Sequence, residues 1–89
     1  MELQDRLDIL LALAEELGIA VRAEPLGGDG GGLCTLRGRQ ILFVDTSADP
    51  EIRYERTLKG LAALPEVDDR YLRPEIRRDL DACRDSLNE

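Results

Sequence analysis

Residues 26–34 contain five of the chain's eight glycines, followed by Cys34. The glycines could bind an anion, and the Cys34 thiol could attack a substrate. Successive backbone N–H groups of a glycine loop can surround a phosphate. A phosphate loop of the Walker type needs Lys and then Ser or Thr after its last glycine, and a dinucleotide loop needs G-x-G-x-x-G; neither pattern occurs. We expect a flexible connector at 27–32. The alternative is a loop, including Gly30 and Gly31, that closes over a small ligand or anion beside Cys34 and Arg37.

The cysteines offer little reactive chemistry, because a thiolate needs a base or a positive environment and the chain has no His. Cys–His and Ser–His pairs and all His-containing metal sites are therefore excluded. We interpret Cys34 and Cys83 as small buried hydrophobic residues in a reducing cytosol. A disulfide and a reactive Cys34 are the alternatives. Glu66, Asp68 and Asp69 resemble a solvated surface more than a cation site, so we expect no catalytic residue, metal or cofactor.

The charge of the chain argues against nucleic-acid and membrane partners. Its formal net charge is −7, which repels phosphate backbones and anionic lipid. The arginines between Arg70 and Arg84 alternate with acids and form no basic stripe. The longest apolar run, 9–14, is far shorter than the roughly twenty residues of a membrane span, and the acidic start at Glu2 predicts no export signal. These observations favour a cytoplasmic protein.

The hydrophobic pattern predicts one small α+β domain over residues 1–89, with element order α-β-β-β-α-α. The expected elements are helix 3–17, strand 19–24, strands 33–37 and 40–45, helix 50–64, and a helix from 74 onward. We expect a three-stranded, at least partly antiparallel sheet. Gly18 should end the first helix with Ile19 packed back on it. Gly60, inside the second helix, predicts a close approach to another element.

A two-residue turn at Gly38-Arg39 is expected to join the second and third strands, with glycine first as a type II′ turn requires. In that register Cys34, Leu36, Ile41 and Phe43 share one face of the sheet, which we assign to the core. The opposite face carries Leu33, Thr35, Leu42 and Val44. It is too apolar for water, so either a helix or another chain should cover it.

Part of the chain resembles a known family. Leu17-Gly18-Ile19-Ala20-Val21, a glycine-bearing hairpin, Ile41-Leu42-Phe43-Val44-Asp45 and a helix with Arg56-Thr57-Leu58 resemble the front half of the ImmA/IrrE-type metallopeptidases. The resemblance covers about half of the chain and implies a similar α/β scaffold. In that family a helix with H-E-x-x-H follows. Those three positions fall on Gly60, Leu61 and Leu64, which cannot bind zinc or act as a base, so the resemblance implies no peptidase activity.

The function predicted from these features is a non-enzymatic protein-interaction or regulatory module of the bacterial cytosol, acting as a homodimer or with an unidentified protein partner. The apolar surface of the first helix and the face with Leu33, Leu42 and Val44 motivate this expectation. The alternatives are a small-ligand or anion-binding domain that uses the loop at 27–32 and a thiol enzyme that uses Cys34.

Overall fold

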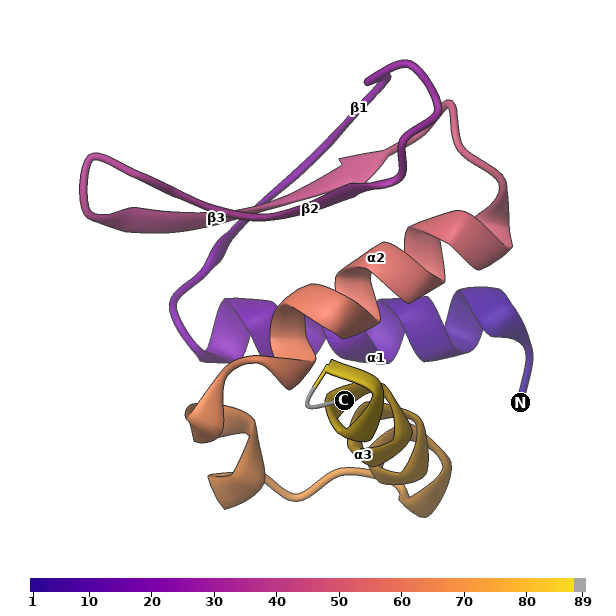
Figure 1. Ribbon diagram of the computed structural model, residues 1–89, viewed down its shortest axis with the longest axis vertical. Helices are drawn as coiled ribbons and strands as arrows, with labels where there is room; N and C mark the ends of the chain where they lie inside the picture. The colour runs from indigo at the N-terminus through magenta and orange to yellow at the C-terminus, as the bar shows by residue number, and fades with distance from the viewer. Residues whose placement is uncertain (88–89) are drawn as a thin grey trace.

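The computed structural model describes residues 1–87 as three helices and a three-stranded sheet (Figure 1). The elements are α1 (Leu3–Glu16), β1 (Ala20–Glu24), β2 (Gly31–Leu36), β3 (Arg39–Asp45), α2 (Pro50–Ala62), the 3₁₀ helix η1 (Pro65–Asp69) and α3 (Pro74–Leu87). This arrangement confirms the predicted α+β class and element order, to which η1 is an addition. Over residues 1–87, none of the helices is long and apolar enough to cross a membrane.

The sheet has the strand order β1-β3-β2, with the longest strand in the middle. β1 runs parallel to β3, and β2 runs antiparallel to it. The expectation of a partly antiparallel sheet is therefore confirmed. The two edge strands are β1 and β2, so both sides of the sheet end in a strand that has a neighbour on one side only.

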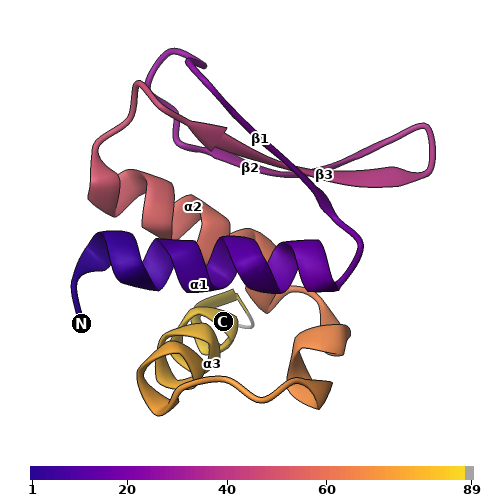
Figure 2. The ribbon, with the colours of Figure 1, turned by 180° about the vertical axis from the view of Figure 1, so that it is seen from behind.

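The molecule is built in layers, which Figure 1 and the reverse view in Figure 2 show edge-on. The sheet forms one outer layer, α1 and α2 pack beneath it, and α3 lies beneath those two helices. The buried residues between the layers are mostly aliphatic: Leu7, Leu10, Leu13, Ala14, Ile19, Leu42, Tyr54, Leu58, Leu61, Ala62, Val67, Ile76 and Leu80. Within residues 1–87, no helix covers the far side of the sheet in either view. One face of the sheet is therefore open.

The end of α1 follows the predicted stop signal. Gly18 has a φ of 80°, a left-handed conformation that glycine adopts without strain. The Ile19 N–H donates to the Ala14 carbonyl oxygen at 3.0 Å, and the Ile19 side chain is buried. This hydrogen bond spans the last turn and closes the helix in the manner of a Schellman motif. It also sets the direction in which β1 starts.

Gly60 lets α2 approach the sheet closely, as the sequence predicts. A Cβ atom at this position would lie 2.9 Å from the Leu33 Cβ atom and 3.3 Å from the Leu33 nitrogen. The first contact is shorter than two carbon atoms accept, and the second is also tight. The close approach is between helix and sheet, and it brings β2 down onto α2.

The predicted hairpin turn is wrong by one residue. Leu36 pairs with Arg39, so Arg37 and Gly38 are the two turn residues. Their φ angles are 52° and 79°, and two positive values define a type I′ turn, with glycine second. A type I′ turn twists in the same sense as the two strands that it joins. Arg39 is the first paired residue of β3, so it lies outside the turn. The pairing shifts by two residues, so the same residues still share a face.

The predicted core face of the hairpin is also wrong. Leu42 and Val44 are buried beneath the sheet, and Leu33 is half-buried above Gly60. Cys34 is exposed and Leu36 keeps 57 % of its surface in water. The face expected to need a cover is covered by the chain's own α1 and α2. The physical reason is that Arg22 and Arg39 lie on the same face of the sheet as Cys34. Burying that face would leave their charges without partners.

Candidate functional site

The outer face is our name for the side of the sheet that no helix covers. Its side chains are Ala20, Arg22 and Glu24 from β1, Cys34 and Leu36 from β2, and Arg39, Ile41 and Phe43 from β3. The two arginines, Cys34 and Leu36 are exposed, and Ile41 and Phe43 are partly exposed. An apolar strip thus runs along the middle of a solvent-facing sheet. A contiguous surface of this kind on a small domain is typical of a binding site.

Asp45, at the end of β3, organises the glycine-rich loop. Its Oδ1 atom accepts hydrogen bonds from the N–H groups of Leu26 at 2.8 Å and Ser47 at 2.9 Å. Its Oδ2 atom accepts from Gly28 at 2.6 Å and Gly30 at 3.1 Å. The side chain has no exposed surface. The loop that the sequence predicts as a flexible connector is therefore held in place by one carboxylate.

The pKa of Asp45 reflects this environment. Burial by itself raises the pKa of the carboxyl, but the backbone N–H donors outweigh burial and lower the pKa from 3.8 to about 2. Three loop N–H groups that could have held an external anion already bind this internal one. The loop thus resembles an anion-binding nest in which the bound anion is the Asp45 carboxylate of the same chain.

The site residues predicted from the sequence fall in three places. Gly31 begins β2, and Gly30 directly precedes the strand, where its N–H donates to Asp45 Oδ2. Cys34 lies on the outer face, Arg37 lies in the hairpin turn, and both are exposed. Leu33, Leu42 and Val44 lie on the helix side of the sheet, where Leu42 and Val44 are buried by the chain itself and Leu33 is half-buried.

The sequence reasoning did not single out three residues of the candidate site: Asp45, Arg22 and Arg39. The alternation of Arg39 with Ile41 and Phe43 along one strand could have indicated which face meets water, because an unpaired arginine is rarely buried. Arg22 joins that face only through the parallel pairing of β1 with β3. The sequence contains no local signal for that pairing.

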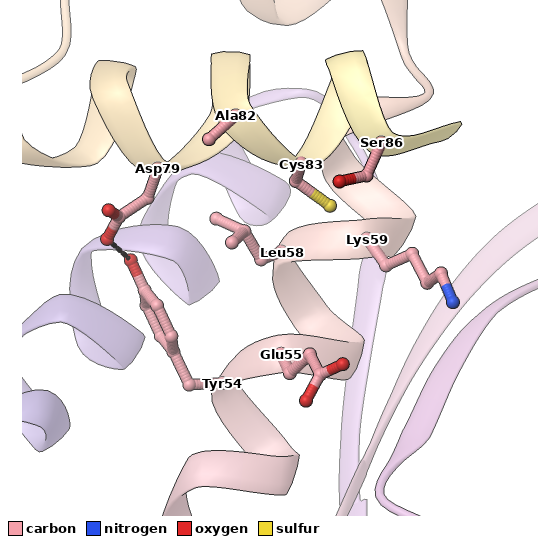
Figure 3. A pocket seen from close by; sticks show the side chains of 8 residues that line it. All are labelled: Tyr54, Glu55, Leu58, Lys59, Asp79, Ala82, Cys83 and Ser86. Atoms are coloured by element: carbon pink, nitrogen blue, oxygen red, sulfur yellow. Dashed lines mark hydrogen bonds between the residues drawn. The ribbon is translucent and has the colours of Figure 1, made fainter. Parts of the chain in front are cut away.

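A second surface feature is a pocket of about 550 Å³ between α2 and α3 (Figure 3). Its lining residues are Tyr54, Glu55, Leu58, Lys59, Asp79, Ala82, Cys83 and Ser86. At one end, as Figure 3 shows, the Tyr54 hydroxyl donates to Asp79 Oδ2 at 2.5 Å. Arg6 of α1 donates to the same oxygen at 2.8 Å. Asp79 thereby ties all three helices together.

The chemistry of this pocket is structural. Burial raises the pKa of the Cys83 thiol above its ordinary value, although Lys59 opposes the change. Burial and the hydrogen bond to Asp79 likewise raise the pKa of Tyr54. Both groups therefore stay protonated near neutral pH, and neither is a ready nucleophile or base.

Replacing Tyr54 by Phe tests the role of this network. Tyr54→Phe should lower the free energy of unfolding by about 1 kcal/mol, the usual net contribution of one hydrogen bond, since Arg6 still neutralises Asp79. Urea unfolding followed by circular dichroism measures the change. Tyr71→Phe is the matched control, because Tyr71 is 89 % exposed and should leave stability unchanged. Equal midpoints for the two variants would contradict the assignment.

Over the described part of the chain, no group of three or more His, Cys, Asp or Glu side chains is placed to hold a metal ion. Comparisons of the chain with protein-family models, with curated proteins and with solved structures give no match. The resemblance to the ImmA/IrrE-type metallopeptidases stays a prediction. Any functional conclusion must therefore come from the geometry of the outer face, the Asp45 loop and the pocket between α2 and α3.

Proposed function

We propose that this chain is a non-enzymatic protein-interaction domain of the bacterial cytosol that works as a homo-oligomer through its outer face. The observation that carries the proposal is the open apolar strip, in which Leu36 is 57 % exposed beside an exposed Cys34. Burying one such leucine stabilises an interface by about 1.5–3 kcal/mol. An exposed free thiol also fits a reducing compartment.

The alternative, a small-ligand or anion site on the loop at 27–32, has less support. The N–H groups of Leu26, Gly28 and Gly30 already donate to Asp45. An incoming phosphate would have to displace a carboxylate that belongs to the fold. The thiol-enzyme alternative has no partner for Cys34, because the sequence contains no His to act as its base.

The proposal predicts concentration-dependent self-association that depends on Leu36. Sedimentation velocity of the wild-type chain from micromolar to millimolar concentration should show a monomer–dimer equilibrium. Leu36→Ser should raise the dimer Kd at least tenfold, because two symmetry-related leucines lose their apolar contact.

Tyr71→Ser is the matched control, since it removes another exposed apolar side chain that lies outside the sheet, between η1 and α3. Its Kd should equal that of the wild type. A wild-type chain that stays monomeric at millimolar concentration would overturn the proposed function, and so would equal effects of the two substitutions.

A further inference from the structure

The glycine-rich loop contains two neighbouring residues, Asp29 and Gly30, that can react with each other. Asp29 is the only aspartate of the sequence that is directly followed by glycine. Because glycine has no side chain, nothing shields its nitrogen from the carboxyl of the preceding residue, and its backbone turns freely. An Asp-Gly pair in an unfolded chain is therefore well suited to rearrange to isoaspartate.

This rearrangement needs no co-reactant except water. The Gly30 nitrogen attacks the Asp29 Cγ atom, so a nitrogen–carbon bond forms, and the carboxyl hydroxyl leaves with the amide proton as water. Water then opens the resulting cyclic imide at one of its two carbonyls. Cleavage between the nitrogen and Cγ restores aspartate. Cleavage between the nitrogen and the Asp29 backbone carbonyl carbon leaves a chain that runs through Cβ and Cγ, at unchanged mass.

The two reacting groups lie in different surroundings. Asp29 is exposed, so water can leave and enter at its carboxyl, whereas Gly30 is buried. A Cβ atom on Gly30 would lie 2.5 Å from Arg56 Cγ and 2.7 Å from Ile52 Cγ2, both in α2. The backbone of Gly30 is thus packed against this helix. The peptide bond that precedes it has little room to rotate while the loop stays in place.

Asp45 restrains the attacking nitrogen directly. The Gly30 N–H donates to Asp45 Oδ2 at 3.1 Å, and the Asp45 N–H donates to the Gly30 carbonyl oxygen at 3.4 Å. Figure 1 shows the loop between β1 and β2 beside the end of β3, where Asp45 lies. The nitrogen must lose its proton before it attacks Asp29. A carboxylate that accepts a hydrogen bond from that N–H stabilises the protonated form, because its negative charge opposes a second one.

We infer that Asp29–Gly30 is a site of isoaspartate formation, and that Asp45 controls the rate by holding the Gly30 nitrogen. Conversion starts from the fraction of molecules in which the loop has left Asp45. The rate in the folded chain is therefore the rate of the unfolded chain multiplied by that open fraction. This inference does not depend on self-association through the outer face.

Conversion changes the loop for good. Isoaspartate adds one backbone atom between the Asp29 Cα atom and the Gly30 nitrogen. The N–H groups of Gly28 and Gly30, which both donate to Asp45 Oδ2, then lose the spacing that lets them share this oxygen. The isomerised chain should unfold at a lower temperature than the original one. Each opening of the loop thus carries a chance of a covalent change that keeps it open.

Ageing of the purified chain at neutral pH, well below its unfolding transition, tests the inference. Trypsin releases the peptide 23–37, whose only aspartate is Asp29, and chromatography separates its isoaspartyl form at unchanged mass. The folded wild type should convert at least about tenfold more slowly than the same chain in urea. Asp45→Asn should convert about tenfold faster than the folded wild type, because hydrogen bonds to a charged acceptor are lost. Circular dichroism confirms that this variant is folded during ageing.

Two further variants serve as controls. Asp49→Asn should convert at the wild-type rate, because Asp49 is exposed and its side chain forms no capping hydrogen bond. Asp29→Glu should give no isomerised peptide, since its longer side chain would have to close a larger ring. Equal rates for Asp45→Asn and Asp49→Asn would overturn the inference. If Asp45→Asn does not fold, the wild type alone decides, and a folded wild type that converts as fast as the chain in urea refutes the protection.

Discussion

The Asp45→Asn variant should lose much of the stability of the domain, with a Tm lower by on the order of 10 °C at neutral pH. Each carboxylate oxygen accepts two backbone N–H groups: Oδ1 from Leu26 and Ser47, and Oδ2 from Gly28 and Gly30. An asparagine replaces one oxygen by an NH₂ group that can only donate. Because both positions face two donors, neither orientation of the amide avoids placing N–H against N–H.

The matched control is Asp49→Asn, four residues further along the chain. Asp49 precedes α2, is exposed, and forms no capping hydrogen bond through its side chain. Its replacement should change the Tm by no more than a few degrees. Circular dichroism measures both transitions, and hydrogen exchange at the Gly28 and Gly30 amides reports the loop directly. Equal transitions for the two variants, or unchanged protection of these amides, would contradict the role of Asp45.

The Asp45 carboxylate also makes the stability of the domain depend on pH. The pKa of Asp45 is lowered to about 2 in the folded chain from 3.8, so the folded state binds this proton more weakly than the unfolded state. The stabilisation is fully present above pH 3.8 and is lost as the pH falls through 3.8 toward 2. The Tm difference between wild type and Asp45→Asn should therefore be constant from pH 7 to about 5 and shrink below 4.

Local patterns predicted the helices and their ends well, because a single turn of backbone decides them. The stop at Gly18 is one case: a left-handed glycine and a buried Ile19 need only neighbouring residues. The close approach at Gly60 is another, although the sequence could not name Leu33 as the group approached. Predictions of this kind succeed where the interacting groups are close in sequence.

The orientation of the sheet was harder, because both faces of the hairpin are apolar. The pair Leu42 and Val44 and the pair Ile41 and Phe43 differ little in hydrophobicity, so alternation alone cannot choose between them. The choice depends on long-range facts: Arg22 reaches the outer face only because β1 pairs with β3, and α2 covers the side that contains Leu33. The interpretation of Cys34 as a buried residue depended on that choice of face. It is therefore wrong as well, because Cys34 is exposed.

The candidate site itself was only partly predictable. The glycine-rich loop was singled out for its composition, but its function in the fold depends on Asp45, which the sequence places fifteen residues beyond Gly30. An acid that directly follows an apolar strand has many possible roles. Only the return of the chain beside β3 brings the loop N–H groups to this carboxylate, and no spacing rule predicts that return.

Gly31→Ala should be the most damaging single-methyl change in the chain. Gly31 has a φ of 88°, and a Cβ atom there would lie within 2.1 Å of the Phe43 carbonyl oxygen and 2.7 Å of its carbon. Those atoms belong to the central strand, so they cannot move aside without opening the ladder between β2 and β3. Backbone strain and overpacking together should cost about 3 kcal/mol or more.

Gly27→Ala separates the two parts of that cost. Gly27 has a φ of 92°, nearly the same as Gly31, but a Cβ atom there would meet nothing within 4 Å. This variant should therefore lose only the backbone part, about 1–2 kcal/mol. Urea unfolding of both proteins gives the difference, which is the cost of the contact with Phe43. If Gly31→Ala is too unstable to fold, a low soluble yield of this variant beside a folded Gly27→Ala variant also shows that the contact with Phe43 is costly. Equal stabilities would mean that β2 does not lie as close to β3 at this point, and the glycine would then be required by the turn alone.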